Sequence, residues 1–362
     1  MTSSHRDDRS SGNDDAAAAR ASSHDTARAR GLDVPSLVGG VTAGDRATLA
    51  RAMTLIESSS PRHAASADLL LTRLLPRTGG SVRVGITGVP GAGKSTFIEE
   101  LGTRLTAQGK RVAVLAVDPS SSVTGGSVLG DKTRMARLAA DERAFVRPSP
   151  SSGELGGVAR KTREAVLLCE AAGYDVVFVE TVGVGQSETV VAGMTDIFVA
   201  LLIAGAGDEL QGIKRGLLEL VDVVAINKAE GENRVSAERA ATTHRTAFHL
   251  VSRGEGERAP VVHTCSAMTG DGIAEIWQGI EDRAAAMRSS GALAERRSTQ
   301  AVAWMRALLD DRIRSLLDSA PGVAQERAEL EGAVRRGEMP ATVAVERLIR
   351  RMGVALDRGS GA

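Results

Sequence analysis

The sequence has few aromatic residues and no net charge. Aromatic side chains make up 2% of its 362 residues, so the core must be aliphatic, and the stacking platforms of single-strand nucleic-acid binders are not expected. The 45 basic and 45 acidic residues give a net charge of 0, which offers no global electrostatic attraction to nucleic acid or anionic membrane. Any partner must therefore be recognised at a specific site.

Metal-binding cysteine patterns and long apolar runs are also missing. Cys169 and Cys265 stand alone, without CxxC or Cys/His ligand spacing, which is typical of proteins in a reducing compartment. The longest apolar run, residues 197–204, is too short to span a bilayer and predicts a buried strand. The opening MTSSHRDDRSS contains no apolar segment of a secretion signal. We therefore expect a cytoplasmic protein without a membrane span.

The composition changes along the chain and predicts four parts. Residues 1–31 hold almost no large apolar side chain and are expected to be a disordered tail. Residues 32–79 predict a helical N-terminal subdomain. Residues 80–288 alternate β-branched runs with helix-length segments and are expected to hold the main domain. Residues 289–362 lose the strand pattern and predict a helical extension.

Helical spacing marks both flanking parts. In the N-terminal part, Thr42 and Asp45 make a capping-box-like start, and apolar residues follow at helical spacing. In the C-terminal part, one apolar helix face is formed by Val302, Met305, Leu309, Ile313 and Leu316. The extension is expected either to complete the core as a helical lid or to serve as a dimerisation arm.

The middle part predicts an α/β fold. Its candidate strands are residues 82–87, 111–117, 174–180, 197–203, 222–227 and 260–265. These runs alternate little and are separated by helix-length segments, which is typical of a mostly parallel, doubly wound sheet covered on both faces. Ligands of such sheets bind beyond the carboxyl ends of the strands.

A phosphate-binding loop follows the first of these strands. The segment GVPGAGKST, residues 88–96, fits GxxxxGK[ST] between a predicted strand and a predicted helix, which is the context a P-loop requires. Loop amides would surround the phosphates, Lys94 would reach the β and γ phosphates, and the Ser95 hydroxyl would ligate Mg²⁺. The predicted phosphate-binding residues are Gly88, Gly91, Ala92, Gly93, Lys94, Ser95 and Thr96.

Two carboxylates are predicted at the same edge of the sheet. Asp118 and Glu180 each end a strand, where Mg²⁺ and its waters need acceptors. Gly183 lies three residues after Glu180, in the place of the DxxG switch of other GTPases, and would turn its amide toward a γ phosphate.

The segment NKAE, residues 227–230, predicts a guanine site with one departure. Asn227 would face the base, and the Lys228 stem would cover the ring. Glu230 stands where other GTPases have Asp; it offers the same two acceptors if the backbone withdraws slightly, and weaker discrimination is its expected cost. Ser266 and Ala267 follow another strand, as in the loop whose backbone amide meets guanine O6.

Taken in order, GVPGAGKST, VDPSS, GGSVLGDKTRM, ETVGVGQSE, GAGDELQGIKRG and NKAE resemble the MeaB/ArgK family of P-loop GTPases, which includes the methylmalonic aciduria type A protein. The resemblance implies a P-loop NTPase fold of the signal-recognition-particle/MinD/BioD class. It also implies a homodimeric GTPase, using GTP/GDP and Mg²⁺. Such a chaperone gates cofactor loading of an adenosylcobalamin-dependent acyl-CoA mutase, usually methylmalonyl-CoA mutase, and protects that enzyme.

The resemblance also assigns residues to roles. The implied Mg²⁺ site comprises Ser95, Asp118, Asp131 and Glu180. The implied catalytic set is Lys94, Asp118, Glu180 and Gln186, with Asp118 orienting the attacking water. The segment that communicates with the mutase would include Asp208, Glu209, Gln211, Lys214 and Arg215. Slow intrinsic turnover is expected, because the sequence shows no committed base or arginine finger.

The sequence leaves three other functions open. A nickel-inserting metallochaperone would need a His-rich tail or a Cys/His cluster, whereas the 6 histidines are dispersed. An ATP-dependent kinase or transport ATPase would need an adenine site, against which NKAE argues. A nucleotide-sensing module would bind GTP without cleaving it. The sequence does not identify the client mutase, and without a DxHxxG cobalamin motif any contact with cobalamin would be through that client.

Overall fold

In the computed structural model, the described residues are 33–117, 134–149, 155–181, 187–205, 220–250, 259–319 and 322–351. The predicted tail and the predicted communicating segment, residues 207–216, lie outside them. The chain forms two compact units, residues 1–286 and 287–362. Within the described ranges, every helix is too short or too polar to cross a membrane.

The N-terminal part is helical. It contains α2 (Val34–Thr42), α3 (Arg46–Glu57), α4 (Pro61–Leu74) and the 3-10 turn η1 (Leu75–Arg77). The Asp45 carboxylate caps α3 by accepting the Thr48 N–H at 2.8 Å, as the capping pattern predicts. Thr42 does not belong to that cap, because it is the last residue of α2. Helix α2 was not recognised as a separate helix, since the adjacent Gly39 and Gly40 weaken its helical propensity.

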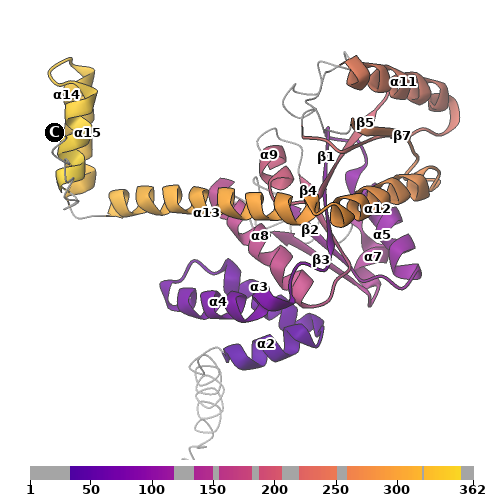
Figure 1. Ribbon diagram of the computed structural model, residues 1–362, viewed down its shortest axis with the longest axis horizontal. Coiled ribbons are helices and arrows are strands. Elements are labelled where there is room, and N and C mark those ends of the chain that lie inside the picture. The colour runs from indigo at the N-terminus through magenta and orange to yellow at the C-terminus, as the bar shows by residue number, and fades with distance from the viewer. Residues whose placement is uncertain are drawn as a thin grey trace, which may run out of the picture. The chain divides into compact units, whose positions relative to one another are not determined.

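The first unit is built on a parallel sheet (Figure 1). The described strands are β1 (Val82–Gly88), β2 (Val112–Val117), β3 (Ala144–Ser149), β4 (Val176–Thr181), β5 (Ile197–Ile203), β6 (Val223–Asn227) and β7 (Val261–Thr264). They are ordered β3-β2-β4-β1-β5-β6-β7, and each neighbouring pair is parallel. The predicted parallel, doubly wound P-loop fold is confirmed.

Strand β3 was missed by the sequence prediction. It lies at the edge of the sheet beside β2, with Ala116 opposite Pro148. Proline lacks the N–H that a central strand needs, but an edge strand tolerates it. The short segment AFVRPS therefore looks like a loop in sequence, although it completes the sheet.

Helices cover both faces of the sheet, as right-handed crossovers between parallel strands require. They are α5 (Lys94–Ala107), α7 (Ala136–Ala140), α8 (Leu155–Ala171), α9 (Ser187–Ala192), α11 (Arg234–Leu250) and α12 (Ile273–Ser289), with the 3-10 turn η3 (Gly231–Asn233) before α11. Figure 1 shows α5 and α7 on one side of the sheet and α8 and α9 on the other. The chain leaves the central strand β1 directly into the P-loop and α5.

The N-terminal helices pack on the first unit's outer layer. Helices α3 and α4 contact α8. Arg147 of β3 pairs with Glu57 of α3 at 2.5 Å, and the Arg46 guanidinium donates to the Asp141 carbonyl at 3.1 Å. These contacts attach the helical part at several points of the sheet's edge.

The second unit consists of α13 (Ala292–Ser319), α14 (Val323–Arg335) and α15 (Ala341–Arg351) among its described residues. Glu326 of α14 pairs with Arg347 at 3.3 Å and Arg351 at 3.4 Å, which ties α14 to α15. The predicted apolar face of α13 is helical, but its five members are 43–59% exposed. These residues, Val302, Met305, Leu309, Ile313 and Leu316, are called the α13 stripe below.

Candidate functional site

The P-loop occupies the turn between β1 and α5. Gly88 passes so close to β5 that a Cβ would lie 2.2 Å from the Leu201 carbonyl oxygen. Gly93, with φ 87°, is the residue before α5, and a Cβ there would lie 2.7 Å from Nδ2 of Asn227. Side chains at these two positions would displace the loop, so the glycines are needed for its path.

Lys94 begins α5 and folds back over its own loop. Its Nζ donates to the Gly88 carbonyl at 2.9 Å and to the Val89 carbonyl at 3.4 Å. Burial lowers the pKa of Lys94, while the charges of Glu180 and Glu188 act to raise it. The ammonium is therefore held among loop carbonyls and acids beside the predicted phosphate site.

Ser95 and Glu180 meet across the same site. The Ser95 hydroxyl at the start of α5 donates to Oε1 of Glu180 at 3.0 Å. Glu180, near the end of β4, is 7% exposed. Mg²⁺ is commonly held by one or two protein oxygens together with substrate phosphates and water, so a hydroxyl and a carboxylate at this separation fit that ion. The other two predicted ligands, Asp118 and Asp131, lie outside the described residues.

Asn227 connects the P-loop to the predicted base site. Its Nδ2 donates to the Ala92 carbonyl at 2.8 Å, and its Oδ1 accepts the Ala267 N–H at 2.9 Å. The Cys265 thiol also donates to Oδ1 at 3.6 Å. Since Asn227 is 2% exposed, these contacts fix the carboxamide at the end of β6.

The two residues that follow in NKAE differ in exposure. Lys228 is exposed and has φ 61°, and its carbonyl accepts Nδ2 of Asn233 at 2.7 Å. Glu230 is half-buried, and its Oε2 is buried with no hydrogen-bond partner in the described part of the chain. A buried acceptor of this kind costs free energy unless a donor satisfies it, as the edge of a guanine base would.

The loop after β7 contains the last residues of the predicted base site. Ser266 is fully buried; its N–H donates to the Asp271 carbonyl at 2.9 Å and its Oγ accepts the Thr269 N–H at 3.1 Å. The Ala229 N–H donates to the Cys265 carbonyl at 3.0 Å, so the NKAE turn and this loop are joined by backbone as well. The predicted base residues are therefore brought together.

The remaining predicted site residues are outside the described part of the chain. They are Asp118, Asp131, Gly183, Gln186, Asp208, Glu209, Gln211, Lys214 and Arg215. Glu188 was not predicted, although its charge acts on Lys94. Its place in ETVGVGQSE, close after Glu180, is the sequence feature that points to it.

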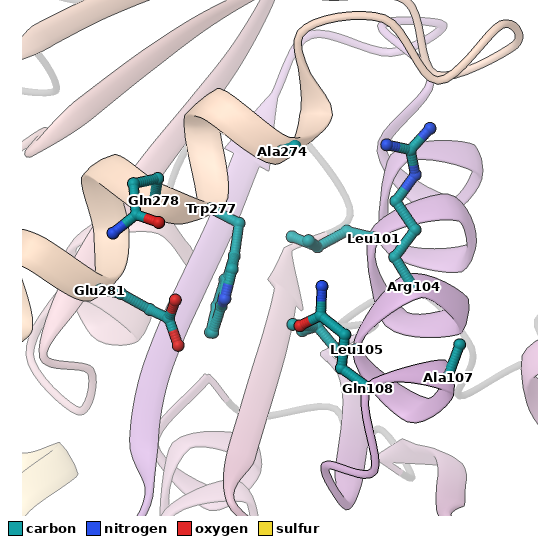
Figure 2. A pocket seen from close by; sticks show the side chains of 9 residues that line it. All are labelled: Leu101, Arg104, Leu105, Ala107, Gln108, Ala274, Trp277, Gln278 and Glu281. Carbon is teal, nitrogen blue, oxygen red and sulfur yellow. The ribbon is translucent and has the colours of Figure 1, made fainter.

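A separate pocket of about 560 Å³ lies between the second half of α5 and the first half of α12. Figure 2 shows Trp277 of α12 facing Leu101 and Leu105 of α5, with Arg104 at the rim. None of the predicted nucleotide residues lines it. It is therefore distinct from the site at the P-loop, although it touches the helix that begins there.

Comparison with known proteins gives a consistent assignment. A family model described as methylmalonyl Co-A mutase-associated GTPase MeaB matches residues 49–322. GTPase ArgK of Escherichia coli is 54% identical over 270 residues, covering 75% of this chain and 82% of that protein. The mitochondrial methylmalonic aciduria type A homolog of Mus musculus is 45% identical over 327 residues, covering 88% of this chain and 79% of that protein.

A solved structure agrees with these sequence relatives. The crystal structure of an LAO/AO transport system kinase superposes with a TM-score of 0.72 at 41% identity, covering 88% of this chain and 97% of that one. Residues 49–322, which the family model matches, include the P-loop and the Asn227 contacts described above. The chain belongs to the MeaB family of P-loop GTPases.

Proposed function

We propose that this GTPase is a Mg²⁺-dependent, guanine-selective chaperone of an adenosylcobalamin-dependent acyl-CoA mutase, with methylmalonyl-CoA mutase as its client. GTP hydrolysis to GDP and phosphate follows from membership of the family. The observation that supports guanine selectivity is the pair of Asn227 hydrogen bonds, because they join the P-loop to the loop proposed to contact the base. The descriptions of the family and of the mouse relative support the mutase part.

The phosphate half of the mechanism uses Lys94. The nucleotide phosphates would replace the Gly88 and Val89 carbonyls as partners of its ammonium. The positive charge and the loop amides then offset the negative charge that spreads over the transferring phosphoryl group. A Mg²⁺ ion, when bound, neutralises phosphate charge. Ser95 and Glu180 would hold it, with Asp118 and Asp131 as further proposed ligands.

Water activation is assigned to residues after β2 and β4. Asp118 is proposed to orient the attacking water, and Gln186 is the second candidate. Gly183 is proposed to direct its amide at the γ phosphate. Since neither acceptor is a strong base at neutral pH, intrinsic turnover should be slow, and association with the client should regulate it.

The base half uses the residues around Asn227. Asn227 and the Ala267 amide would face the O6/N7 side of guanine, while the exposed Lys228 stem covers the ring. The Glu230 carboxylate, whose Oε2 has no hydrogen-bond partner among the described residues, would accept from the N1 and N2 donors with its two oxygens. An adenine ring lacks both of these donors and would leave the carboxylate unsatisfied, which favours GTP over ATP.

Communication with the mutase is assigned to residues 207–216. Formation of the homodimer is assigned to the second unit. GTP binding and hydrolysis would act as the switch that gates cofactor loading and protects the mutase. The α13 stripe supports the dimer proposal, because five large apolar residues on one helix face are 43–59% exposed. Such a face is typical of an interface with a partner helix.

The nucleotide assignment is tested by competitive binding of GDP, XDP and ADP in Mg²⁺ to the wild type and to Glu230→Asp. We expect GDP to bind more tightly than XDP or ADP by more than about tenfold, roughly 1.4 kcal/mol. Equal binding of GDP and ADP by the wild type, with selectivity gained only in Glu230→Asp, would contradict guanine selection by Glu230.

The chaperone assignment is tested with purified methylmalonyl-CoA mutase. The mutase should co-elute with the GTPase in a nucleotide-dependent manner, and its inactivation during turnover should slow in the presence of GTPase and GTP. Lys94→Met serves as the control that separates nucleotide switching from simple association. An unchanged inactivation rate, with no complex in any nucleotide state, would reject this client.

A further inference from the structure

Two buried threonines join the strand that enters the P-loop to the strand that carries Glu180. Oγ1 of Thr181 donates to Oγ1 of Thr87 at 2.9 Å. Thr87 is 1% exposed and Thr181 is fully buried. Thr87 is followed directly by Gly88, and Glu180 directly precedes Thr181. The hydroxyl pair therefore lies one residue from each half of the phosphate and Mg²⁺ site.

This bond begins where the backbone pairing of the two strands stops. The register of β1 with β4 ends at Ile86 opposite Glu180. Beyond that step, Gly88 is opposite Leu201 of β5, and Thr181 is opposite Val117 of β2. The end of β1 is therefore paired with β5, and the end of β4 is paired with β2. The Thr87–Thr181 hydrogen bond connects these two strand ends through side chains.

The pair also lies on the opposite face of the sheet from Ser95. Side chains alternate along a strand, so Thr87 shares a face with Gly85, where an added Cβ would meet Val191 of α9. Glu180 is one residue before Thr181 and points the other way, toward Ser95 on α5. The Thr87–Thr181 contact on the α9 face therefore fixes the end of β4, where the preceding residue, Glu180, reaches the α5 face.

We propose that Thr87 and Thr181 are positioning residues that set the separation of Glu180 from the P-loop and thereby the Mg²⁺-dependent part of nucleotide affinity. This inference rests on the proposed Mg²⁺ site at Ser95 and Glu180. The hydroxyls touch neither nucleotide nor ion, and they act through the placement of their neighbours.

The magnitude of the effect follows from contact distances. Two hydroxyl oxygens approach to 2.9 Å here because they are hydrogen-bonded, whereas a methyl carbon in place of one oxygen needs a separation of about 3.5 Å. Thr181→Val keeps the branched shape, but it replaces the donor with a methyl group and forces the strand ends apart. Thr181→Ser removes the methyl and keeps the bond.

The test is the affinity for N-methylanthraniloyl-GDP, measured by fluorescence in MgCl₂ and in EDTA. The variants are Thr87→Val, Thr181→Val, the double valine variant, and Thr87→Ser and Thr181→Ser as matched controls. In each valine variant, the factor by which Mg²⁺ raises the affinity should fall by about fivefold or more. This change corresponds to the free energy of one buried hydrogen bond. The affinity in EDTA should stay at the wild-type value. The serine variants should keep the full increase in affinity that Mg²⁺ gives. The double valine variant should lose no more of this increase than either single valine variant.

Three outcomes would overturn the proposal. The first is that Mg²⁺ raises the affinity of both valine variants by the same factor as in the wild type. The second is that the serine and valine variants lose this factor equally. The third is that the losses multiply in the double variant, which would show that the two residues act independently. Circular dichroism and thermal unfolding check each fold, and Thr87→Val tests the bond if Thr181→Val does not fold. A wild type whose affinity is the same in MgCl₂ and in EDTA would instead reject the underlying Mg²⁺ site.

Discussion

Lys94 makes two hydrogen bonds to its own loop, and the phosphates of a bound nucleotide would replace them. Its ammonium contacts the carbonyls of Gly88 and Val89, so binding exchanges two loop acceptors for phosphate oxygens. The exchange would keep the half-buried ammonium hydrogen-bonded, since a polar group withdrawn from water without partners costs free energy.

We predict that Lys94→Met lowers the GTP hydrolysis rate by about a hundredfold or more, because the charge that stabilises the transferring phosphoryl group is gone. The rate is measured as phosphate release in single turnover. Lys110→Met is the matched control. Lys110 pairs with Glu281 at 2.6 Å and lies over the Trp277 ring at 5.5 Å, remote from the phosphates in sequence and contact. A similar loss in both variants would contradict this role of Lys94.

Cys265 lies in the base loop but is not poised to react. Burial raises the pKa of the Cys265 thiol to about 12, and the charge of Glu230 adds to the shift. Burial likewise raises the pKa of Cys169. Because the thiolate is the nucleophile, both cysteines should be unreactive toward DTNB in the native protein at pH 8, and both should react after unfolding in guanidinium. Fast reaction of either thiol in the native protein would show that the base loop at Cys265 or helix α8 at Cys169 opens.

At the scale of elements, helix α8 is attached to the sheet through one carboxylate. Glu170 accepts from Nη2 of Arg83 at 2.7 Å, from Oγ of Ser81 at 2.7 Å and from the Gly79 N–H at 2.9 Å. Burial acts to raise the pKa of Glu170, but these hydrogen bonds, with the charge of Arg83, outweigh it and lower the pKa. The contact joins the start of β1 to the helix that packs on the other face from α5.

We predict that Glu170→Gln destabilises the protein by about 3 kcal/mol at neutral pH, because it leaves the buried Arg83 guanidinium without its counter-charge. The free energy of unfolding is measured in urea. Arg160→Gln, which removes an exposed ion pair on the same helix, should cost at most about 1 kcal/mol. Equal effects of the two variants would mean that the buried pair contributes no more than a surface pair.

The pH dependence of the Glu170 contribution has a definite sign. A carboxyl with a lowered pKa in the folded state contributes stability above its unfolded value, here 4.5, and loses it as pH falls through the folded value. The difference between wild type and Glu170→Gln should therefore be full at neutral pH and should shrink below pH 4.5. A difference that grows on acidification would contradict the lowered pKa.

Local pattern decides which elements could be predicted from sequence. The apolar runs of β1 and β5 and the glycines of the P-loop carry their own periodicity or spacing. Strand β3 contains Pro148 and helix α2 contains Gly39 and Gly40, so neither element fits the strand or helix propensities of its residues. The edge position of β3 and the packing of α2 compensate for these residues. The Thr87–Thr181 bond joins residues 94 apart and the Asn227–Ala92 bond joins residues 135 apart. Spacing alone does not reveal such contacts.

At the scale of the whole molecule, the α13 stripe is an apolar helix face that lies exposed in the described part of the second unit. Val302, Leu309 and Leu316 recur at intervals of seven residues, as in the seam of a coiled coil. All three are at least 43% exposed. A second copy of the chain, presenting the same face, would cover them.

We predict that the wild type is a dimer and that Leu309→Lys shifts it toward monomer, because it places a charge in the seam. Light scattering after size-exclusion chromatography measures the mass. Asp311→Lys introduces the same side chain on the opposite face of α13 and should leave the dimer intact. A wild-type monomer, or equal loss of dimer in both variants, would exclude α13 as the dimer contact.

In the proposed guanine site, the single carboxamide of Asn227 would make the base pocket and the phosphate loop share one equilibrium. Ordering of the Ala92 carbonyl by phosphate would stabilise the carboxamide that holds the Ala267 amide, and ordering by a purine would act in the reverse direction. Thermodynamic linkage requires the two effects to be equal. Guanosine and pyrophosphate, supplied as separate fragments, would therefore each raise the affinity of the protein for the other by the same factor.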